Sequence, residues 1–276
     1  MTTTEAIAVG DYTFDVDISG PDDGEPIVAL HGFPESKAEW TPLTQRLVAE
    51  GYRVIAPNQR GYSPGARPTD VASYEMEHLV ADVIGLLDAL NLDTAHIVGH
   101  DWGAVVAWFV AGQHADRVRT LTAVSIPHPA AFGWAIRNDE VQQQRSAYFT
   151  LFRQEGKAEH VLLADDAAKL RAMYGDTIDP AYIEPHVQLL TQPGALTGGL
   201  SWYRAMSRDF GDLGSIEVPT TYIWSTGDLA VSRAAAERSG DHVSGPYEVI
   251  ELPDVSHWLP EEAPDALAEA VLRRIR

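Results

Sequence analysis

The sequence predicts an α/β protein with a mainly parallel, doubly wound sheet and an inserted helical lid. Strand-like apolar runs alternate with helical patterns in both the first and the last part of the chain. This alternation breaks between residues 125 and 218, where roughly ninety residues of largely helical pattern intervene, far more than a crossover needs. A glycine-flanked turn at residues 99–103 joins a buried strand pattern to a helix pattern.

The elements follow one another in regular order along the predicted core. Short apolar or alternating runs predict strands at residues 12–18, 26–30, 52–56, 96–98, 118–124, 220–224 and 247–252. Apolar residues at helical spacing predict helices at residues 38–49, 75–90, 104–112, 233–238 and 263–275. Because strands and helices alternate along most of the core, the sheet is expected to be mainly parallel.

The helical insert is predicted to form a lid. Its clearest helical patterns cover residues 141–154, 158–174 and 180–190. It follows the strand that comes after the turn at residues 99–103, which places it above that turn. We therefore expect a core of residues 1–128 and 214–276, and a helical cap of residues 129–213.

Composition excludes several classes of protein. The chain has 276 residues, 40 acidic against 20 basic, and a net charge of −20, so nucleic acid and anionic membrane surfaces are not expected partners. The absence of cysteine excludes disulfides, thiol catalysis and cysteine-ligated metal. There is no run of 18 apolar residues and no signal-peptide pattern, so a cytoplasmic location is expected. Monomer and homodimer are both compatible with the sequence.

Residues 99–103 (Gly-His-Asp-Trp-Gly) have the spacing of a nucleophile elbow, G-x-S-x-G, with Asp101 in place of serine. The glycines are needed because β-carbons do not fit beside the central residue of so sharp a strand-to-helix turn. An aspartate there attacks carbon, forms an ester and is regenerated by water. The alternative is that Asp101 only caps the following helix.

Hydrolysis of such an ester requires a general base, for which histidine is suited. His257 is the best candidate because its loop follows the last strand and lies at the same end of the sheet as Asp101. His31, His100 and His128 are competitors.

The base needs an acid that orients it. Asp228 follows a strand directly and completes the chain order nucleophile, acid, base. Asp212, Asp241 and Asp254 match it in type but not in position, and a turn-capping role for Asp228 is the alternative.

An oxyanion at the ester requires hydrogen-bond donors. The residue after the nucleophile, Trp102, is expected to supply one backbone N–H. The loop of residues 31–35 (His-Gly-Phe-Pro-Glu) is expected to supply the other, from Phe33.

Together, residues 31–35, 99–103, 227–228 (Gly-Asp) and 256–258 (Ser-His-Trp) resemble the epoxide hydrolases of the α/β-hydrolase fold. The resemblance covers nearly the whole chain and implies an eight-stranded core. It also implies two lid tyrosines that hold the epoxide oxygen, which in this sequence are Tyr148 and Tyr203. A phenol suits that role because it donates strongly while staying neutral.

The expected substrates are a small apolar epoxide and water, with no metal or cofactor. The expected substrate pocket contains Phe149, Phe152 and Trp202. A haloalkane dehalogenase, which shares the aspartate nucleophile, is the nearest alternative. Many dehalogenases have asparagine where this chain has Phe33, whose side chain cannot donate to a halide. A non-catalytic ligand-binding protein on the same fold is the third possibility.

Overall fold

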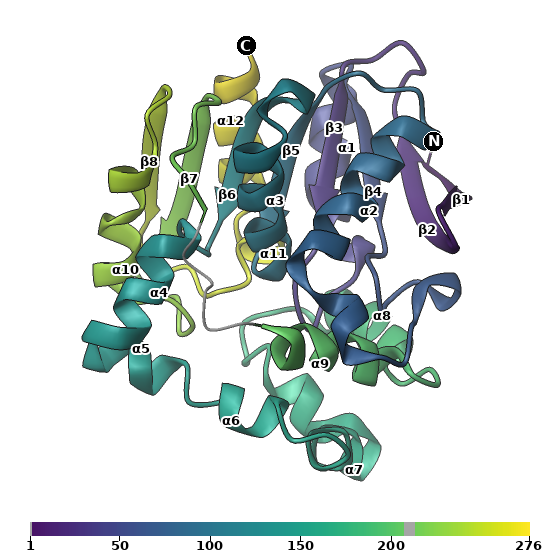
Figure 1. The fold of residues 1–276 in the computed structure, drawn as a ribbon, viewed down its shortest axis with the longest axis vertical. Coiled ribbons are helices and arrows are strands. Elements are labelled where there is room, and N and C mark those ends of the chain that lie inside the picture. The colour runs from purple at the N-terminus through teal and green to yellow at the C-terminus, as the bar shows by residue number, and fades with distance from the viewer. Residues whose placement is uncertain (1, 207–212) are drawn as a thin grey trace.

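The computed structural model describes residues 2–206 and 213–276, and within them the chain forms one eight-stranded sheet in the order β1-β2-β4-β3-β5-β6-β7-β8 (Figure 1). β1 and β2 pair antiparallel with each other, and β2 with β4, while all other pairs are parallel. The prediction of a mainly parallel α/β fold is therefore confirmed. The strands are β1 (Thr2–Val9), β2 (Tyr12–Ser19), β3 (Pro26–Leu30), β4 (Arg53–Pro57), β5 (Ala95–His100), β6 (Val118–Val124), β7 (Thr220–Ser225) and β8 (Tyr247–Leu252).

Helices cover both faces of the sheet, as a doubly wound fold requires (Figure 1). α1 and α12 pack together on one face, and α2 and α3 on the other. All six residues of β5 are buried because the strand is covered on both faces. The core helices are α1 (Thr41–Ala49), α2 (Met76–Ala89), α3 (Trp102–Gln113), α10 (Arg233–Glu237), α11 (Leu259–Glu262) and α12 (Pro264–Ile275).

The parallel register brings the functional loops to one edge of the sheet. Leu30 at the end of β3 pairs with Gly99 on β5, and His100 pairs with Val124 at the end of β6. The loops that follow β3, β5, β6, β7 and β8 therefore leave the sheet at the same edge. Ligands of parallel α/β sheets bind at this carboxyl edge.

The segment between β6 and β7 contains six helices within its described residues, and they gather beyond the carboxyl edge of the sheet (Figure 1). Residues 207–212 lie outside the described residues, and the division into core and cap stays a prediction. The helices are α4 (Pro129–Asn138), α5 (Glu140–Arg145), α6 (Phe149–Phe152), α7 (Lys157–Ala172), α8 (Pro180–Leu190) and α9 (Ala195–Ala205).

Two predicted helices of this segment are wrong in detail. The single helix expected at residues 141–154 is broken between α5 and α6. Gln142, within α5, donates to the Ser146 hydroxyl at the break and to the Ala230 carbonyl. The helix expected at residues 158–174 is interrupted inside α7 by left-handed residues 165–167. Two of these are aspartates, which tolerate this conformation better than most residues.

Strand β1 has no counterpart among the predicted strands. It lies at the sheet edge with most of its residues exposed, so it lacks the apolar alternation by which a half-buried strand is recognised. Among the described residues, no helix combines the length and the apolar character that crossing a membrane requires.

Two glycines allow α9 to lie directly on the loop after β4. A β-carbon on Gly198 would lie 2.6 Å from the Gly61 Cα atom, and one on Gly61 would lie 2.7 Å from the Gly198 carbonyl carbon. Both obstacles are backbone atoms, so no side-chain movement relieves them. Close contact between this helix and the core thus depends on glycine at both positions.

We expect Gly198→Ala to lower the free energy of unfolding by about 1–3 kcal/mol, because α9 must move away from the loop. Chemical denaturation followed by circular dichroism measures the change. Gly133→Ala on α4 is the matched control, since its added carbon meets only the flexible end of Arg137 at 3.4 Å. That control should be neutral or stabilising. Equal stability of Gly198→Ala and the parent would contradict the contact.

Candidate active site

Asp101 stands in a strained turn between β5 and α3. Its backbone has φ 48° and ψ −121°, outside the region that non-glycine residues favour. The flanking glycines are necessary, because a β-carbon on Gly103 would lie 1.9 Å from the Leu30 carbonyl oxygen and one on Gly99 would lie 2.3 Å from the Gly103 oxygen. The Asp101 side chain makes no capping hydrogen bond to α3, so the capping alternative is wrong.

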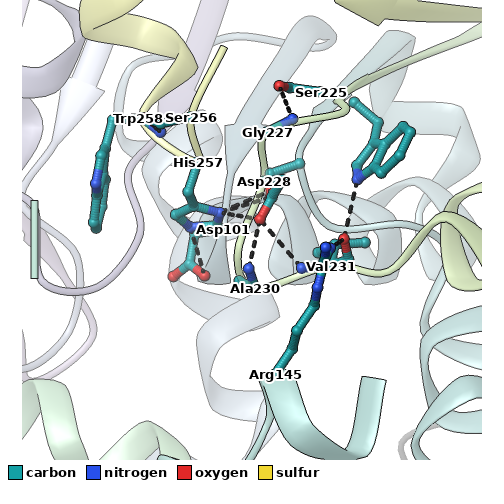
Figure 2. Close-up of polar contacts among 12 residues, drawn as sticks. Asp101, Arg145, Ser225, Gly227, Asp228, Ala230, Val231, Ser256, His257 and Trp258 are labelled. Carbon is teal, nitrogen blue, oxygen red and sulfur yellow. Dashed lines mark hydrogen bonds and ion pairs between the residues drawn. The ribbon is translucent and has the colours of Figure 1, made fainter. Parts of the chain in front are cut away.

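His257 and Asp228 lie beside Asp101, as Figure 2 shows. The His257 Nε2 atom is 3.5 Å from Asp101 Oδ2, and its Nδ1 atom is 3.1 Å from both carboxylate oxygens of Asp228. The Asp228 Oδ1 atom also accepts hydrogen bonds from the backbone N–H groups of Ala230 and Val231. Asp228 therefore makes both the turn-capping contacts and the contact that orients His257.

Contacts among these three residues shift the pKa values of His257 and Asp228. Burial alone would lower the pKa of His257, but the Asp228 charge and hydrogen bonds to Asp101 and Asp228 outweigh it and raise the pKa to about 9. Burial would raise the pKa of Asp228, yet the His257 charge and several hydrogen bonds hold it below its usual range. In the resting state the imidazole is thus charged between two carboxylates.

Two further residues contact His257: Ser125, which was not identified from the sequence, and His100, which was considered there as a competing base. Ser125, directly after β6, donates from Oγ to Asp228 Oδ2 at 2.6 Å and lies 3.0 Å from His257 Nδ1. The His100 Nε2 atom lies 2.9 Å from the main-chain oxygen of His257, so it contacts the loop that carries His257. The signal for Ser125 was its place at the carboxyl end of a parallel strand, the position that also selected Asp228.

The loop after β3 contacts the nucleophile directly. The backbone N–H of Phe33 donates to Asp101 Oδ1 at 2.8 Å, so one of the two predicted oxyanion donors lies against the carboxylate. Gly32 makes this approach possible, because a β-carbon there would lie 2.4 Å from the Asp101 Cβ atom. Trp102, the other predicted donor, is buried at the first position of α3.

The two predicted lid tyrosines meet near Asp101. Tyr148 precedes α6 and Tyr203 lies on α9, and their ring centroids are 6.1 Å apart. Burial, together with the nearby Asp101 charge, raises the pKa of both phenols above the usual range. Both groups therefore stay neutral hydrogen-bond donors across physiological pH.

A cavity of about 570 Å³ opens in front of Asp101. Its size suits a small organic ligand. Asp101, His257, Tyr148 and Tyr203 face it together with a mostly apolar wall that includes Phe33, Leu151, Phe152, Leu162, Met173 and Trp258.

The three predicted pocket aromatics are placed differently from one another. Phe152 lines the large cavity, and Phe149 lines a smaller one that also borders Asp101. Trp202 lines neither, and its indole N–H donates to the Arg60 carbonyl at 2.9 Å. Consecutive helix residues point about 100° apart, and on α9 the Tyr203 side chain faces the cavity while the Trp202 indole points toward the Arg60 carbonyl. The structure thus corrects the expectation for Trp202.

The competing residues have other partners. The His31 Nε2 atom accepts from the Gln59 N–H, and the His128 Nδ1 atom caps α4 by accepting from Ala130. Asp254 follows β8 at φ 59°, with its N–H bound to the hydroxyl of Thr226. Asp212 lies outside the described residues.

The fold and the site define an α/β-hydrolase-type protein with an aspartate at the nucleophile position. A family model for the alpha/beta hydrolase fold matches residues 25–264. The chain is 34% identical to the AB hydrolase superfamily protein YfhM of Bacillus subtilis, covering 96% of this chain and 94% of that protein. It is 32% identical to epoxide hydrolase A of Mycobacterium tuberculosis, covering 90% of both chains.

Solved structures agree with these relatives. The crystal structure of epoxide hydrolase A from Mycobacterium thermoresistibile has a TM-score of 0.88 and 25% identity, and covers 100% of this chain and 98% of that one. A metagenomic epoxide hydrolase from a hot environment has a TM-score of 0.90 and 30% identity, with 100% and 99% covered. The chain belongs to the epoxide hydrolases of the α/β-hydrolase fold, as the sequence motifs predicted.

We expect Asp228→Asn to lower the pKa of His257 from about 9 by at least about one unit, because a buried negative charge beside the imidazole is removed. A ¹⁵N NMR titration of the histidine side chains measures this pKa. Ser125→Ala is the matched control, since it removes a hydrogen bond but no charge, and should change the pKa much less. An unchanged pKa in Asp228→Asn would show that another group sets the His257 charge.

Proposed function

We propose that the protein hydrolyses epoxides to vicinal diols through a covalent ester on Asp101. The observation that carries this proposal is that the two carboxylate oxygens of Asp101 have different partners. One oxygen, Oδ1, accepts from the Phe33 N–H, while the other, Oδ2, lies 3.5 Å from His257 Nε2. The same cavity contains two neutral phenols, which an epoxide needs and a halide does not. Membership in the epoxide hydrolases supports the same activity.

The first step is ring opening. Asp101 Oδ2 attacks one epoxide carbon from the face opposite the ring oxygen, so a carbon–oxygen bond forms as the ring bond breaks. Tyr148 and Tyr203 donate hydrogen bonds to the ring oxygen as negative charge develops, and one of them gives up its proton. The product is a hydroxyalkyl ester on Asp101 and a transient tyrosinate.

The second step is ester hydrolysis. Once Asp101 is esterified its charge is gone, and the pKa of His257 falls because one of the two carboxylates that raised it is neutral. The His257 imidazolium passes its proton to the tyrosinate. Neutral His257, oriented by Asp228, then takes a proton from water as the resulting hydroxide attacks the ester carbonyl carbon. The oxyanion on Oδ1 is held by the amides of Phe33 and Trp102.

The tetrahedral intermediate then collapses. The bond between the Asp101 carboxyl carbon and Oδ2 breaks, and the diol leaves with a proton from the His257 imidazolium. The proton left on the new carboxyl group returns to His257, which restores the charged imidazolium of the resting enzyme. Water thus supplies one oxygen to Asp101 and, at the next turnover, that oxygen enters the product.

The cavity wall indicates the substrate class. We propose a small apolar epoxide, because most of the side chains around the 570 Å³ cavity are aliphatic or aromatic. The net charge of −20 disfavours nucleic acid and anionic surfaces as partners. We further propose a cytoplasmic enzyme that works as a monomer or homodimer, with the core in residues 1–128 and 214–276 and the lid in residues 129–213.

His257→Gln should form the ester but not release it, because glutamine cannot activate water. Intact mass spectrometry after incubation with styrene oxide should then show the protein plus one substrate. Asp101→Asn provides the control and should show no added mass. If His257→Gln never gains mass, while turning over no substrate, the two-step route is wrong.

Replacing both Tyr148 and Tyr203 by phenylalanine should slow ring opening at least about a hundredfold, because the leaving oxygen loses its proton donors. Single-turnover kinetics of ester formation measure this step directly. Tyr182→Phe, on an exposed position of α8, is the matched control. Near-parental ester formation in the double variant would assign activation of the epoxide to other groups.

A further inference from the structure

Two spaces of very different size meet at the Asp101 carboxylate. The cavity of about 570 Å³ and a second pocket of about 20 Å³ share four lining residues, which are Asp101, Tyr148, Tyr203 and Ala230. The shared residues include the proposed nucleophile and both phenols. An oxirane held between these groups therefore borders both spaces. We call the second space the small pocket.

The small pocket has room for about one small group. A buried water needs roughly 10–15 Å³ of such space, so about 20 Å³ holds one water molecule or a methyl group. A phenyl ring or a longer chain does not fit there unless the wall moves.

The wall of the small pocket belongs largely to the core. Besides the shared residues it consists of Trp102, Val105, Ile126, Phe132, Phe149 and Met206. Val105 on α3, Ile126 after β6 and Phe132 on α4 are each at most 5% exposed. The Ile126 carbonyl accepts a hydrogen bond from the indole N–H of Trp108 on α3 at 3.0 Å, which fixes the backbone at this position. Such close-packed side chains yield little to an added group.

The large cavity has a different kind of wall. It extends from Asp101 toward α6, α7 and the loop that carries His257, and it reaches the surface at residues 175–177 and at Leu229, whose side chain is 78% exposed. A large substituent can therefore occupy this cavity and extend toward its mouth.

We propose that the substrate is an epoxide with one large apolar substituent, whose other ring carbon bears nothing larger than a methyl group. The large substituent occupies the 570 Å³ cavity, and the other ring carbon faces the small pocket. The two substituents of a trans-disubstituted oxirane point away from each other, so a bulky pair would force one of them against the core wall. This inference rests on the proposed epoxide hydrolysis and adds the substitution pattern of the ring.

The test compares two isomeric epoxides with the full chain. In para-phenylstyrene oxide both rings are attached through one oxirane carbon, whereas trans-stilbene oxide has one ring on each carbon. We expect kcat/KM for diol formation to be at least about a hundredfold lower for trans-stilbene oxide, because its second ring meets the small pocket. With trans-β-methylstyrene oxide, kcat/KM should stay within about tenfold of that with styrene oxide, because a methyl group fits.

Ile126→Ala removes three carbons from the wall of the small pocket. It should raise kcat/KM for trans-stilbene oxide, relative to its isomer, at least about tenfold. Leu162→Ala is the matched control, because it removes the same number of carbons from a buried position that lines only the large cavity. That variant should leave the ratio for the two isomers as in the parent.

Equal turnover of the two isomers by the parent would overturn the proposal, and so would an equal rise of the ratio in both variants. If Ile126→Ala fails to fold by circular dichroism, the comparison of isomers in the parent still decides. Failure of the proposed function looks different, since the parent would then convert no epoxide at all, styrene oxide included, and the inference would fall with it.

Discussion

The backbone of Asp101 is the constraint on which the rest of the site depends. A non-glycine residue at φ 48° and ψ −121° costs on the order of 1–3 kcal/mol, and the surrounding structure must compensate. Here β5 is buried on both faces, α3 is buried along most of its length, and Gly99, Gly103 and Gly32 allow three backbone segments to meet. In this conformation the Asp101 carboxylate points to the cavity. A side chain that capped α3 would instead point to the first backbone N–H groups of that helix.

In the proposed cycle, the charge of His257 differs between ring opening and ester hydrolysis. In the resting enzyme, His257 is a cation between Asp101 and Asp228, so it cannot act as a base. Esterification removes the charge of Asp101 and leaves Asp228 as the charged carboxylate that contacts the imidazole among the described residues. The base therefore becomes available when an ester exists to be hydrolysed. The order of the steps follows from charge balance and needs no conformational switch.

The sequence was most informative where backbone geometry restricts residue choice. The glycine spacing around Asp101 and the strand-to-loop positions of Asp228 and His257 correctly predicted which loops meet. The side-chain partners within those loops were harder to predict, because a short serine such as Ser125 has many structural uses. Trp202 was misplaced since aromatic content alone does not say which face of α9 a residue occupies. Strand β1 was missed because an exposed edge strand has little apolar pattern.

The helices between β6 and β7 were the least predictable elements, and the reason is physical. Helices α5, α6 and the two halves of α7 are short, and short helices are stabilised mainly by tertiary contacts. Gln142, for example, lies within α5 and donates to the Ser146 hydroxyl just after the helix and to the Ala230 carbonyl. Tyr148 lies at the end of the break between α5 and α6, directly before α6. The feature that local sequence pattern specifies least is thus the one that decides where the epoxide oxygen is held in the proposed mechanism.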